Sequence, residues 1–309
     1  MMNFLYCFDE NYNIQGYISI HSLLEHIDSK VDIHIIHKNP KSFNKFVVSL
    51  KKHKNLSNLK VYKFNKSIYF PKLNDSHVSE ATYYRIFISD YLDKNIEDLI
   101  YLDADTLIVN NLKSELSIVS QELKSSEKII AAKTEESLSE HSKQLIGIEN
   151  YFNAGVMFID YKKWLQNNVM DGLLLKMKEI EDEIVFWDQD VLNSYFKGKY
   201  LEIQEIFNYK IDVDDPRQEK VKIRNLKILH YVGKSKPWTV RGASKENSSY
   251  YQSKYNELFF LPYHINNNWK RQAYDDLINL YKGKHFKRFR NPFGFFISVL
   301  YFLIKARDK

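Results

Sequence analysis

Short apolar runs alternate with longer amphipathic stretches through the first 160 residues, and this alternation constrains the fold more than any other feature. The apolar runs have the length and composition of buried strands, whereas the longer stretches have helical spacing. The pattern is typical of an α/β fold with a mixed, mostly parallel central sheet flanked by helices. Strands are predicted at residues 4–8, 32–37, 59–64, 99–102, 128–132, 151–164 and 226–232, and helices at 15–26, 41–53, 79–91 and 187–196.

Two carboxylates interrupt one of these apolar runs. Asp103 and Asp105 stand within residues 99–109, which are otherwise almost entirely apolar and read as one central strand. In an extended chain the two side chains project to the same side, roughly 6.5 Å apart along the strand. Two acids at the end of a buried strand repel each other and lose hydration unless a cation lies between them. The pair predicts a divalent metal site, with helix capping or simple hydration as the alternative.

The same Asp-x-Asp spacing occurs again at 188/190 and at 212/214, and context separates the three pairs. Only the first pair lies in a run long enough for a central strand. Asp188 and Asp190 open a predicted helix, where acids often only complement the helix dipole. Asp9 follows the first predicted strand. Because ligands of open α/β sheets bind at the carboxyl ends of strands, Asp9 is expected at the same edge as the first pair.

A predicted strand near residue 152 begins with small residues. Asn153, Ala154 and Gly155 would let a ligand approach the backbone closely. The alternative is a bulge that binds nothing.

The last predicted strand ends at His230 and leads into a loop with cations. Gly233 frees the backbone there, and Lys234 and Lys236 supply positive charge, as a phosphate-binding loop requires. Two carboxylates completed by an imidazole would form a mixed oxygen and nitrogen site. Such a site suits Mn²⁺ better than Mg²⁺ or Ca²⁺.

Composition and charge exclude several protein classes. The single cysteine, Cys7, rules out an intramolecular disulfide and a multi-cysteine zinc site. The N-terminus lacks the basic region and sustained apolar run of a secretory signal, so a cytoplasmic protein is expected. Residues 282–309 contain eight Lys and Arg against one acid, so the net charge of +6 belongs to this tail. A nearly neutral body argues against nucleic-acid binding.

The basic tail contains an apolar run at residues 292–304. This run is shorter than the roughly 20 residues that span a bilayer. It predicts an interfacial helix with aromatic side chains in the lipid and cations on anionic headgroups, unless it docks on the core or a partner. The chain is therefore divided into a catalytic domain, 1–265, and a helical basic and aromatic segment, 266–309, on the inner face of the cell membrane.

Six motifs in a fixed order resemble the retaining glycosyltransferases of family 8, especially the bacterial lipooligosaccharide α-galactosyltransferases and, more distantly, glycogenin. The resemblance extends over about residues 2–240. It implies the GT-A fold, a Rossmann-like fold for nucleotide-diphosphate-sugar transfer, with a UDP-sugar as donor and Mn²⁺, or alternatively Mg²⁺, as cofactor. The motifs stand at residues 8–12, 83–85, 101–105, 152–155, 188–190 and 230–238.

The resemblance also implies roles for individual residues. Asp188 and Gln189 would be catalytic, and this chain has Glu135 and its neighbours where relatives commonly place an aspartate against the sugar. The implied metal ligands are Asp103, Asp105 and His230. The implied donor contacts are Cys7, Asp9, Asn11, Tyr12, Arg85, Asp103, Ala104, Asn153, Ala154, Gly233, Lys234 and Lys236.

The expected function is transfer of a hexose, galactose or glucose, from a UDP-sugar to a glycan of the cell surface. The acceptor would be lipooligosaccharide or lipopolysaccharide, a glycolipid or a glycoprotein glycan. Because Gln189 is a poor nucleophile, front-side attack by the acceptor is favoured over a covalent intermediate. Two alternatives use similar residues: nucleotidyl or phosphoryl transfer, and a non-catalytic module that binds a nucleotide sugar.

Overall fold

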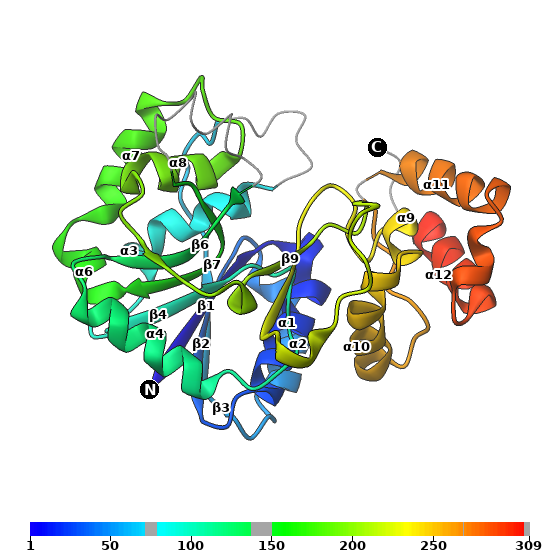
Figure 1. Ribbon diagram of the computed structural model, residues 1–309, viewed down its shortest axis with the longest axis horizontal. Helices are drawn as coiled ribbons and strands as arrows, with labels where there is room; N and C mark the ends of the chain where they lie inside the picture. Colours follow the sequence, from blue (N-terminus) through cyan, green and yellow to red (C-terminus); the bar gives the residue numbers. More distant parts are fainter. Residues whose placement is uncertain (72–78, 137–149, 268, 306–309) are drawn as a thin grey trace. The chain divides into compact units, whose positions relative to one another are not determined.

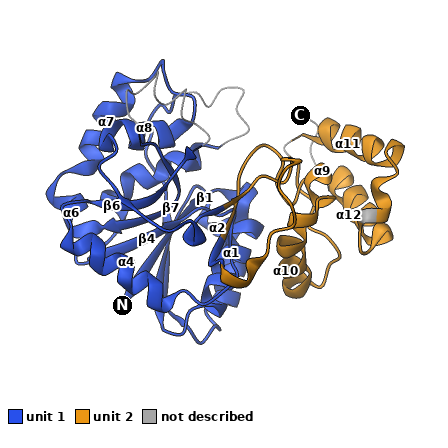
Figure 2. Cartoon of the chain, viewed as in Figure 1, with its two compact units in different colours: residues 1–209, 226–228 blue, residues 210–225, 229–309 orange. Residues whose placement is uncertain are grey.

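The chain forms two compact units (Figure 2). The N-terminal unit comprises residues 1–209 and 226–228, and the C-terminal unit comprises residues 210–225 and 229–309. The structure, a computed structural model, describes residues 1–71, 79–136, 150–267 and 269–305. The predicted boundary at residue 265, between a catalytic domain and a basic tail, is a functional division that differs from these two compact units. It stays a prediction.

A seven-stranded sheet lies at the centre of the N-terminal unit, in the order β3-β2-β1-β4-β7-β6-β8 (Figure 1). Four of its strand pairs are parallel, and β7 runs antiparallel to both β4 and β6. The predicted mixed and mostly parallel sheet is therefore confirmed. Its strands are β1 (Met2–Phe8), β2 (Val31–His37), β3 (Leu56–Lys63), β4 (Asp98–Leu102), β6 (Ile130–Thr134), β7 (Phe152–Asp160) and β8 (Leu201–Glu202).

Helices flank this sheet, as predicted (Figure 1). They are α1 (Asn13–Glu25), α2 (Pro40–Leu50), α3 (Ile88–Tyr91), α4 (Lys113–Ser125), α6 (Tyr161–Gln166), α7 (Val169–Glu179) and α8 (Trp187–Phe196).

The prediction of one α-helix over residues 79–91 is wrong in its first two thirds. Glu80–Phe87 forms a 3₁₀ helix, and only the last turn is α-helical. Ser79 caps the 3₁₀ helix, because its hydroxyl accepts the Ala81 N–H at 3.3 Å. The segment is rich in β-branched and aromatic residues, which lose side-chain freedom in an α-helix, and most of its side chains are buried. Tertiary packing therefore decides its conformation.

The strand predicted at residues 99–102 is confirmed as β4, but the interpretation of the whole interrupted run 99–109 as one central strand is wrong. β4 ends at Leu102, and β5 (Thr106–Ile108) belongs to a second, three-stranded sheet of order β5-β10-β9. The other two strands of this sheet are β9 (Tyr209–Ile211) and β10 (Ile228–Tyr231). Asp103 and Asp105 thus occupy a turn, which the Thr106 N–H closes on the Asp103 carbonyl at 3.2 Å. Aspartate is depleted in strands and favoured in turns, which accounts for the break.

The sheet presents one face to the 3₁₀ helix and to α8. Leu5 and Cys7 of β1 and Tyr101 of β4 belong to one buried cluster with Tyr83 of the 3₁₀ helix and Val191 of α8. Side chains at alternate positions of a strand share a face, so Cys7 and Tyr101 bring this cluster to the carboxyl ends of β1 and β4. Burial therefore positions the elements that carry the predicted site.

The C-terminal unit is mainly helical. Its helices are α9 (Val240–Ala243), α10 (Ser249–Phe259), α11 (Lys270–Lys282) and α12 (Pro292–Lys305). A small core holds α11 and α12 together, with the rings of Phe289 and Phe295 stacked at 3.8 Å. The predicted helix in the tail is confirmed. Among the described residues, no helix has both the length and the apolar content needed to cross a membrane.

Candidate functional site

The buried guanidinium of Arg85 links two carboxylates that are distant in the sequence. Its Nη2 lies 2.9 Å from Oδ1 of Asp103, and its Nε lies 2.8 Å from Oδ2 of Asp188. Nη1 donates to the Ala154 carbonyl at 2.6 Å, and the guanidinium carbon lies 4.1 Å from the centroid of the Tyr101 ring. One side chain thus joins the 3₁₀ helix, the turn after β4, the strand β7 and the helix α8.

Burial and charge shift the ionisation of this cluster. Burial alone would lower the pKa of Arg85, but the carboxylates of Asp103 and Asp188 raise it above its ordinary value. Burial raises the pKa of Asp188 to about 6, although Arg85 and a hydrogen bond from the Thr82 hydroxyl oppose the shift. The cluster therefore keeps a permanent cation beside a carboxylate that titrates close to neutral pH.

The three predicted metal ligands come together. The carboxylates of Asp103 and Asp105 and the imidazole of His230 offer ligand atoms that all lie within 4.8 Å of one another. The turn is anchored, because the Asp103 N–H donates to the Gly155 carbonyl at 2.8 Å. The Tyr101 hydroxyl also donates to Oδ1 of Asp103 at 2.5 Å. Two carboxylates and an imidazole fit a divalent metal ion.

The amide of Gln189 is held at both ends. Its Oε1 accepts the Ala154 N–H at 2.9 Å, and its Nε2 donates to the Tyr151 hydroxyl at 3.2 Å. Tyr151 in turn donates to Oδ1 of Asp190 at 2.7 Å, and Oδ2 of Asp190 accepts two backbone N–H groups just before α8, each at 2.7 Å. Asp190 therefore has a structural role at the start of a helix. The position of the acids at 188/190 in the sequence left such a role open as the alternative to a metal site.

Thr82 and Tyr151 support the two predicted catalytic residues, and the sequence did not single them out. Thr82 bonds Asp188, and Tyr151 bonds Gln189. The only sign of such a role in the sequence is that each residue directly precedes one of the six motifs. A hydroxyl next to a motif is too common to carry a prediction.

The residues predicted to contact uridine and ribose follow β1. Asp9 is buried, and its Oδ1 accepts the Asn11 N–H at 2.9 Å, which caps the 3₁₀ helix Glu10–Tyr12. β1 and β4 are parallel neighbours, so their carboxyl ends lie at one edge of the sheet, as expected. Burial raises the pKa of the Cys7 thiol, which therefore stays protonated. Its thiol is thus not a nucleophile at neutral pH.

A buried carboxylate faces the small-residue start of β7. Glu135 is 7% exposed, and its Oε2 accepts the side-chain amide of Asn153 at 3.4 Å. The Asn208 amide donates to Oδ1 of Asn153 at 3.0 Å. At the position where a departure from the family pattern is expected, the chain therefore still offers an acid beside Asn153.

The loop after β10 carries the predicted diphosphate contacts and belongs to the C-terminal unit. Gly233 has a φ of +80°, and a Cβ at this position would lie 3.1 Å from the Asp212 carboxyl group. A side chain here would be strained by the backbone conformation and would crowd the Asp212 carboxyl group. Lys234 is exposed, and the Lys236 ammonium donates to the Tyr231 carbonyl.

Proteins of similar sequence support the family resemblance. A putative glycosyltransferase of Haemophilus influenzae is 29% identical over 252 residues, which cover 77% of this chain and 73% of the relative. A lipopolysaccharide 1,3-galactosyltransferase of Salmonella typhimurium is 27% identical over 187 residues, which cover 57% of this chain and 54% of the relative.

A solved structure and a family match complete the comparison. The crystal structure of the galactosyltransferase LgtC with donor and acceptor sugar analogues has a TM-score of 0.66 at 22% identity, covering 84% of this chain and 98% of that one. This likeness shows the predicted GT-A fold. Residues 3–241 match the family described as glycosyl transferase family 8, and the chain therefore belongs to that family.

Proposed function

We propose that this glycosyltransferase is a retaining, metal-dependent enzyme that moves a hexose, galactose or glucose, from a UDP-sugar to a glycan of the cell surface. Membership of family 8 supports sugar transfer. Relatives named as lipopolysaccharide 1,3-galactosyltransferase and lipopolysaccharide 1,2-glucosyltransferase support both the choice of hexose and a lipopolysaccharide-type acceptor. The observation that carries the proposal is the link that Arg85 makes between Asp103 and Asp188.

In this proposal the diphosphate of the donor is bound by cations. Asp103, Asp105 and His230 would hold Mn²⁺, with Mg²⁺ as the alternative, and the bound ion would stabilise negative charge on the departing diphosphate. The Lys236 ammonium would add a charge-assisted hydrogen bond to a phosphate oxygen.

The sugar would lie beside Asp188 and Gln189. As the bond from the anomeric carbon to the diphosphate oxygen breaks, the sugar gains oxocarbenium character, which the Asp188 carboxylate stabilises. The acceptor hydroxyl oxygen bonds the same face of that carbon, and its proton passes to the departing phosphate oxygen. The Asp188 carboxylate is paired with Arg85, and both ends of the Gln189 amide are hydrogen-bonded, which favours front-side attack over a covalent intermediate.

Hydrolysis of UDP-sugars tests the donor and the metal together. We expect the purified protein to hydrolyse UDP-galactose or UDP-glucose in the presence of Mn²⁺ and to lose this activity with a chelator. Asp103→Ala and Asp105→Ala should each lower the rate at least a hundredfold. Asp182→Ala, which removes an exposed acid before α8, serves as the matched control and should leave the rate unchanged.

Three results would contradict parts of the proposal. Full hydrolysis by both aspartate variants would refute the metal assignment. Binding of UDP-sugar without turnover, even with acceptor glycan added, would favour the non-catalytic module. A glycosyl group trapped on Asp188 would exclude front-side attack.

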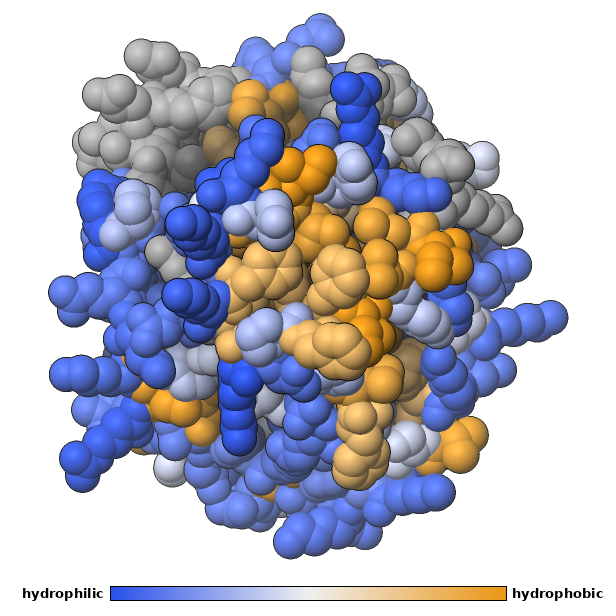
Figure 3. All heavy atoms as spheres, turned by 90° about the vertical axis from the view of Figure 1, so that its right-hand side faces the viewer, coloured by the Kyte–Doolittle hydropathy of each residue, from blue (hydrophilic) through white to orange (hydrophobic). Residues whose placement is uncertain are grey.

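The C-terminal unit supports a membrane-bound location for the enzyme. α12 directs Phe295 and Val299 into the core, yet its outer face is also apolar, where a helix in water would carry polar groups. Phe293 is 75% exposed and Ile304 is 82% exposed, and Figure 3 shows the apolar area to which α12 belongs. Exposed lysines precede and follow α12 in the chain, at Lys282, Lys284, Lys287 and Lys305.

We therefore propose that residues 282–309 lie on the anionic inner face of the cell membrane, with the enzyme in the cytoplasm. An apolar face would enter the headgroup region, and the basic side chains would contact lipid phosphates. This location would bring the enzyme to a lipid-linked acceptor.

A further inference from the structure

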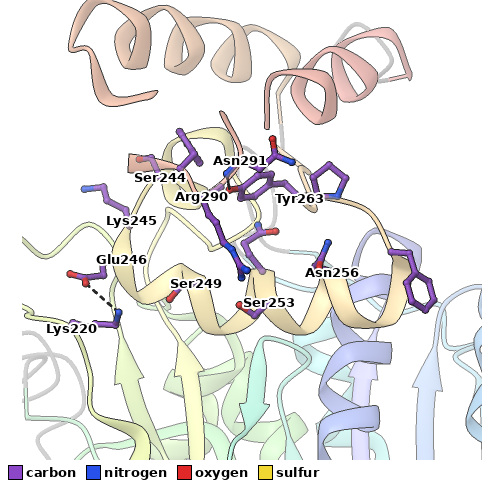
Figure 4. Close-up of a pocket in the computed structure, with 15 residues that line it drawn as sticks. Lys220, Ser244, Lys245, Glu246, Ser249, Ser253, Asn256, Tyr263, Arg290 and Asn291 are labelled. Carbon is purple, nitrogen blue, oxygen red and sulfur yellow. Dashed lines mark hydrogen bonds and ion pairs between the residues drawn. The ribbon is translucent and has the colours of Figure 1, made fainter. Parts of the chain in front are cut away.

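A pocket in the C-terminal unit is built from polar and aromatic residues that the proposed chemistry does not use. Its volume is about 1120 Å³, and all of its lining residues belong to this unit. The lining comes from α10, from the segments that directly precede and follow it, from Lys220 and from residues 289–291 (Figure 4). Binding pockets for small molecules have volumes of roughly 300–1,000 Å³, so this one is large enough for one or more sugar rings.

The pocket carries an excess of positive charge. Lys220, Lys245 and Arg290 line it against a single acid, Glu246. Lys220 pairs with Glu246 at 3.4 Å near one end, and Lys245 lies 3.5 Å from Asp214. Figure 4 shows the Arg290 side chain extending across the pocket toward α10. A guanidinium in such a position can bind phosphate or carboxylate with two parallel hydrogen bonds.

The floor of the pocket below Arg290 is neutral and polar. Ser249, Ser253 and Asn256 stand on one face of α10, at helical spacings of four and three residues, and all three are exposed. Figure 4 shows them along the side of α10 that lines the pocket. Hydroxyl and amide groups both donate and accept hydrogen bonds, as the hydroxyl groups of a sugar do.

An exposed aromatic ring completes the lining. Phe260 ends α10 with a φ of +54°, in the left-handed conformation that usually takes Gly or Asn at a helix end. Its side chain is 89% exposed, so neither the backbone nor core packing accounts for phenylalanine here. Strain of this kind persists where another role requires it. A flat apolar ring at the edge of a polar pocket suits the C–H face of a sugar.

We propose that this pocket binds an anionic saccharide, a sugar that carries a phosphate or carboxylate group. Arg290 binds the anion, α10 binds the hydroxyl groups, and Phe260 packs against the ring. The identification of this saccharide as part of the acceptor glycan rests on the proposed function, whereas the binding itself does not. A cell-surface glycan with acidic sugars close to the growing end would supply such a group.

Calorimetry and saturation-transfer NMR on the full chain test the proposal, with glucose 6-phosphate, galacturonate, glucose and inorganic phosphate as probes. We expect glucose 6-phosphate or galacturonate to bind more tightly than either glucose or phosphate. Arg290→Gln and Phe260→Asn should each weaken this binding at least tenfold. Asparagine tolerates the left-handed conformation, so the second variant removes the ring without disturbing the helix end.

Two substitutions on α11 serve as matched controls. Arg271→Gln removes an exposed guanidinium and Tyr274→Asn an exposed ring, and neither residue lines the pocket. Both variants should bind the probes as the unchanged protein does. Since none of these measurements uses UDP or turnover, failure of the proposed glycosyl transfer would leave their outcome unaffected.

Four outcomes would overturn the proposal. Glucose 6-phosphate and galacturonate could both fail to bind, or they could bind equally well to Arg290→Gln and Phe260→Asn. Inorganic phosphate could bind as tightly as the sugar phosphate, which would reveal an anion site that does not recognise sugar. Loss of binding to phosphatidylglycerol vesicles in Arg290→Gln, without any binding of saccharide, would assign the pocket to a lipid headgroup.

Discussion

At the scale of single residues, Arg85 determines how the candidate site is assembled. Its guanidinium forms ion pairs with Asp103 and Asp188 at once and also bonds the Ala154 carbonyl. A buried cation beside the buried Asp188 carboxylate and the partly buried Asp103 carboxylate limits the electrostatic cost that each acid would have alone. The planar fork of arginine makes this arrangement possible, since Nη2 donates to Asp103, Nη1 to the Ala154 carbonyl and Nε to the Thr82 carbonyl, while Nε also lies at ion-pair distance from Asp188.

Replacement of Arg85 by lysine should therefore destabilise the protein although the charge is kept. An ammonium group cannot reach both carboxylates in this geometry, and one buried acid loses its partner. We expect Arg85→Lys to lower the free energy of unfolding by about 1–3 kcal/mol, measured by urea denaturation. Arg217→Lys, at an arginine that is 89% exposed, should change it by less than about 0.5 kcal/mol. Equal stabilities of the two variants would contradict this account.

Asp188 should make stability depend on pH in an unusual direction for an acid. Burial raises its pKa in the folded protein to about 6 from an ordinary value of about 3.9. Between about pH 4 and pH 6 the folded state therefore holds a proton that the unfolded state has lost. The stability that this group contributes is present below pH 4 and decreases as the pH rises, by at most about 1.4 kcal/mol per pH unit.

Asp188→Asn removes this titration and gives the measurement. The free energy of unfolding of the unchanged protein, minus that of Asp188→Asn, should decrease by more than about 1 kcal/mol between pH 4.5 and pH 6.5. Glu127→Gln, at an acid outside the cluster, should show no such trend. A difference that stays constant with pH would show that Asp188 does not hold its proton in the folded state.

At the scale of secondary structure elements, two histidines make β2 sensitive to acid. Burial lowers the pKa of both His34 and His37 to about 4. His37 Nδ1 accepts the Asn39 N–H at 2.9 Å at the start of α2, and its Nε2 lies 2.8 Å from Oδ1 of Asn13 in α1. A protonated imidazole cannot accept, so protonation breaks the bond to Asn39.

The expected pH dependence has the opposite sign to that of Asp188. Unfolded histidine takes up a proton below about pH 6.5, whereas these two stay neutral in the folded state down to about pH 4. Their stabilising contribution is therefore complete above pH 6.5 and is lost as the pH falls toward 4. His37→Gln should lose less stability than the unchanged protein between pH 6.5 and pH 4.5 in urea denaturation. His285→Gln, in the C-terminal unit, is the control and should lose as much as the unchanged protein.

At the scale of the whole molecule, the outer face of α12 should determine membrane binding. Phe293→Ser together with Ile304→Ser removes two exposed apolar side chains, each worth about 1.5–3 kcal/mol if fully buried in lipid. We expect at least tenfold weaker binding to vesicles that contain phosphatidylglycerol, measured by co-sedimentation, with no loss of folding stability.

The control for this experiment lies in the N-terminal unit. Leu175→Ser in α7 removes a leucine that is 72% exposed and should leave vesicle binding unchanged. High salt should weaken the binding of every variant, because screening reduces attraction between basic side chains and lipid phosphates. Vesicle binding that is unaffected by the double substitution would refute the proposed membrane contact.

The elements of the fold were largely predictable, because each depends on a local apolar period. The strands near Phe4, Ile33 and Ile100 and the helix that begins at Trp187 all form close to where the periodicity places them. Secondary structure predicted from the local apolar period was wrong where polar residues or crowded aromatic side chains determine the backbone conformation instead. Glu80–Phe87 winds as a 3₁₀ helix around buried aromatic rings, and the Asp103 turn divides one apolar run between two sheets.

The sequence by itself determined the α/β class, the family and the identity of the chemically active side chains, since these follow from period, motif order and residue type. Only the tertiary structure decided which of them meet. Arg85 contacts Asp103 and Asp188 because three separate elements pack on one face of the sheet, and Tyr151 reaches Gln189 for the same reason. Contacts between segments so distant in the chain depend on packing, which no local pattern encodes.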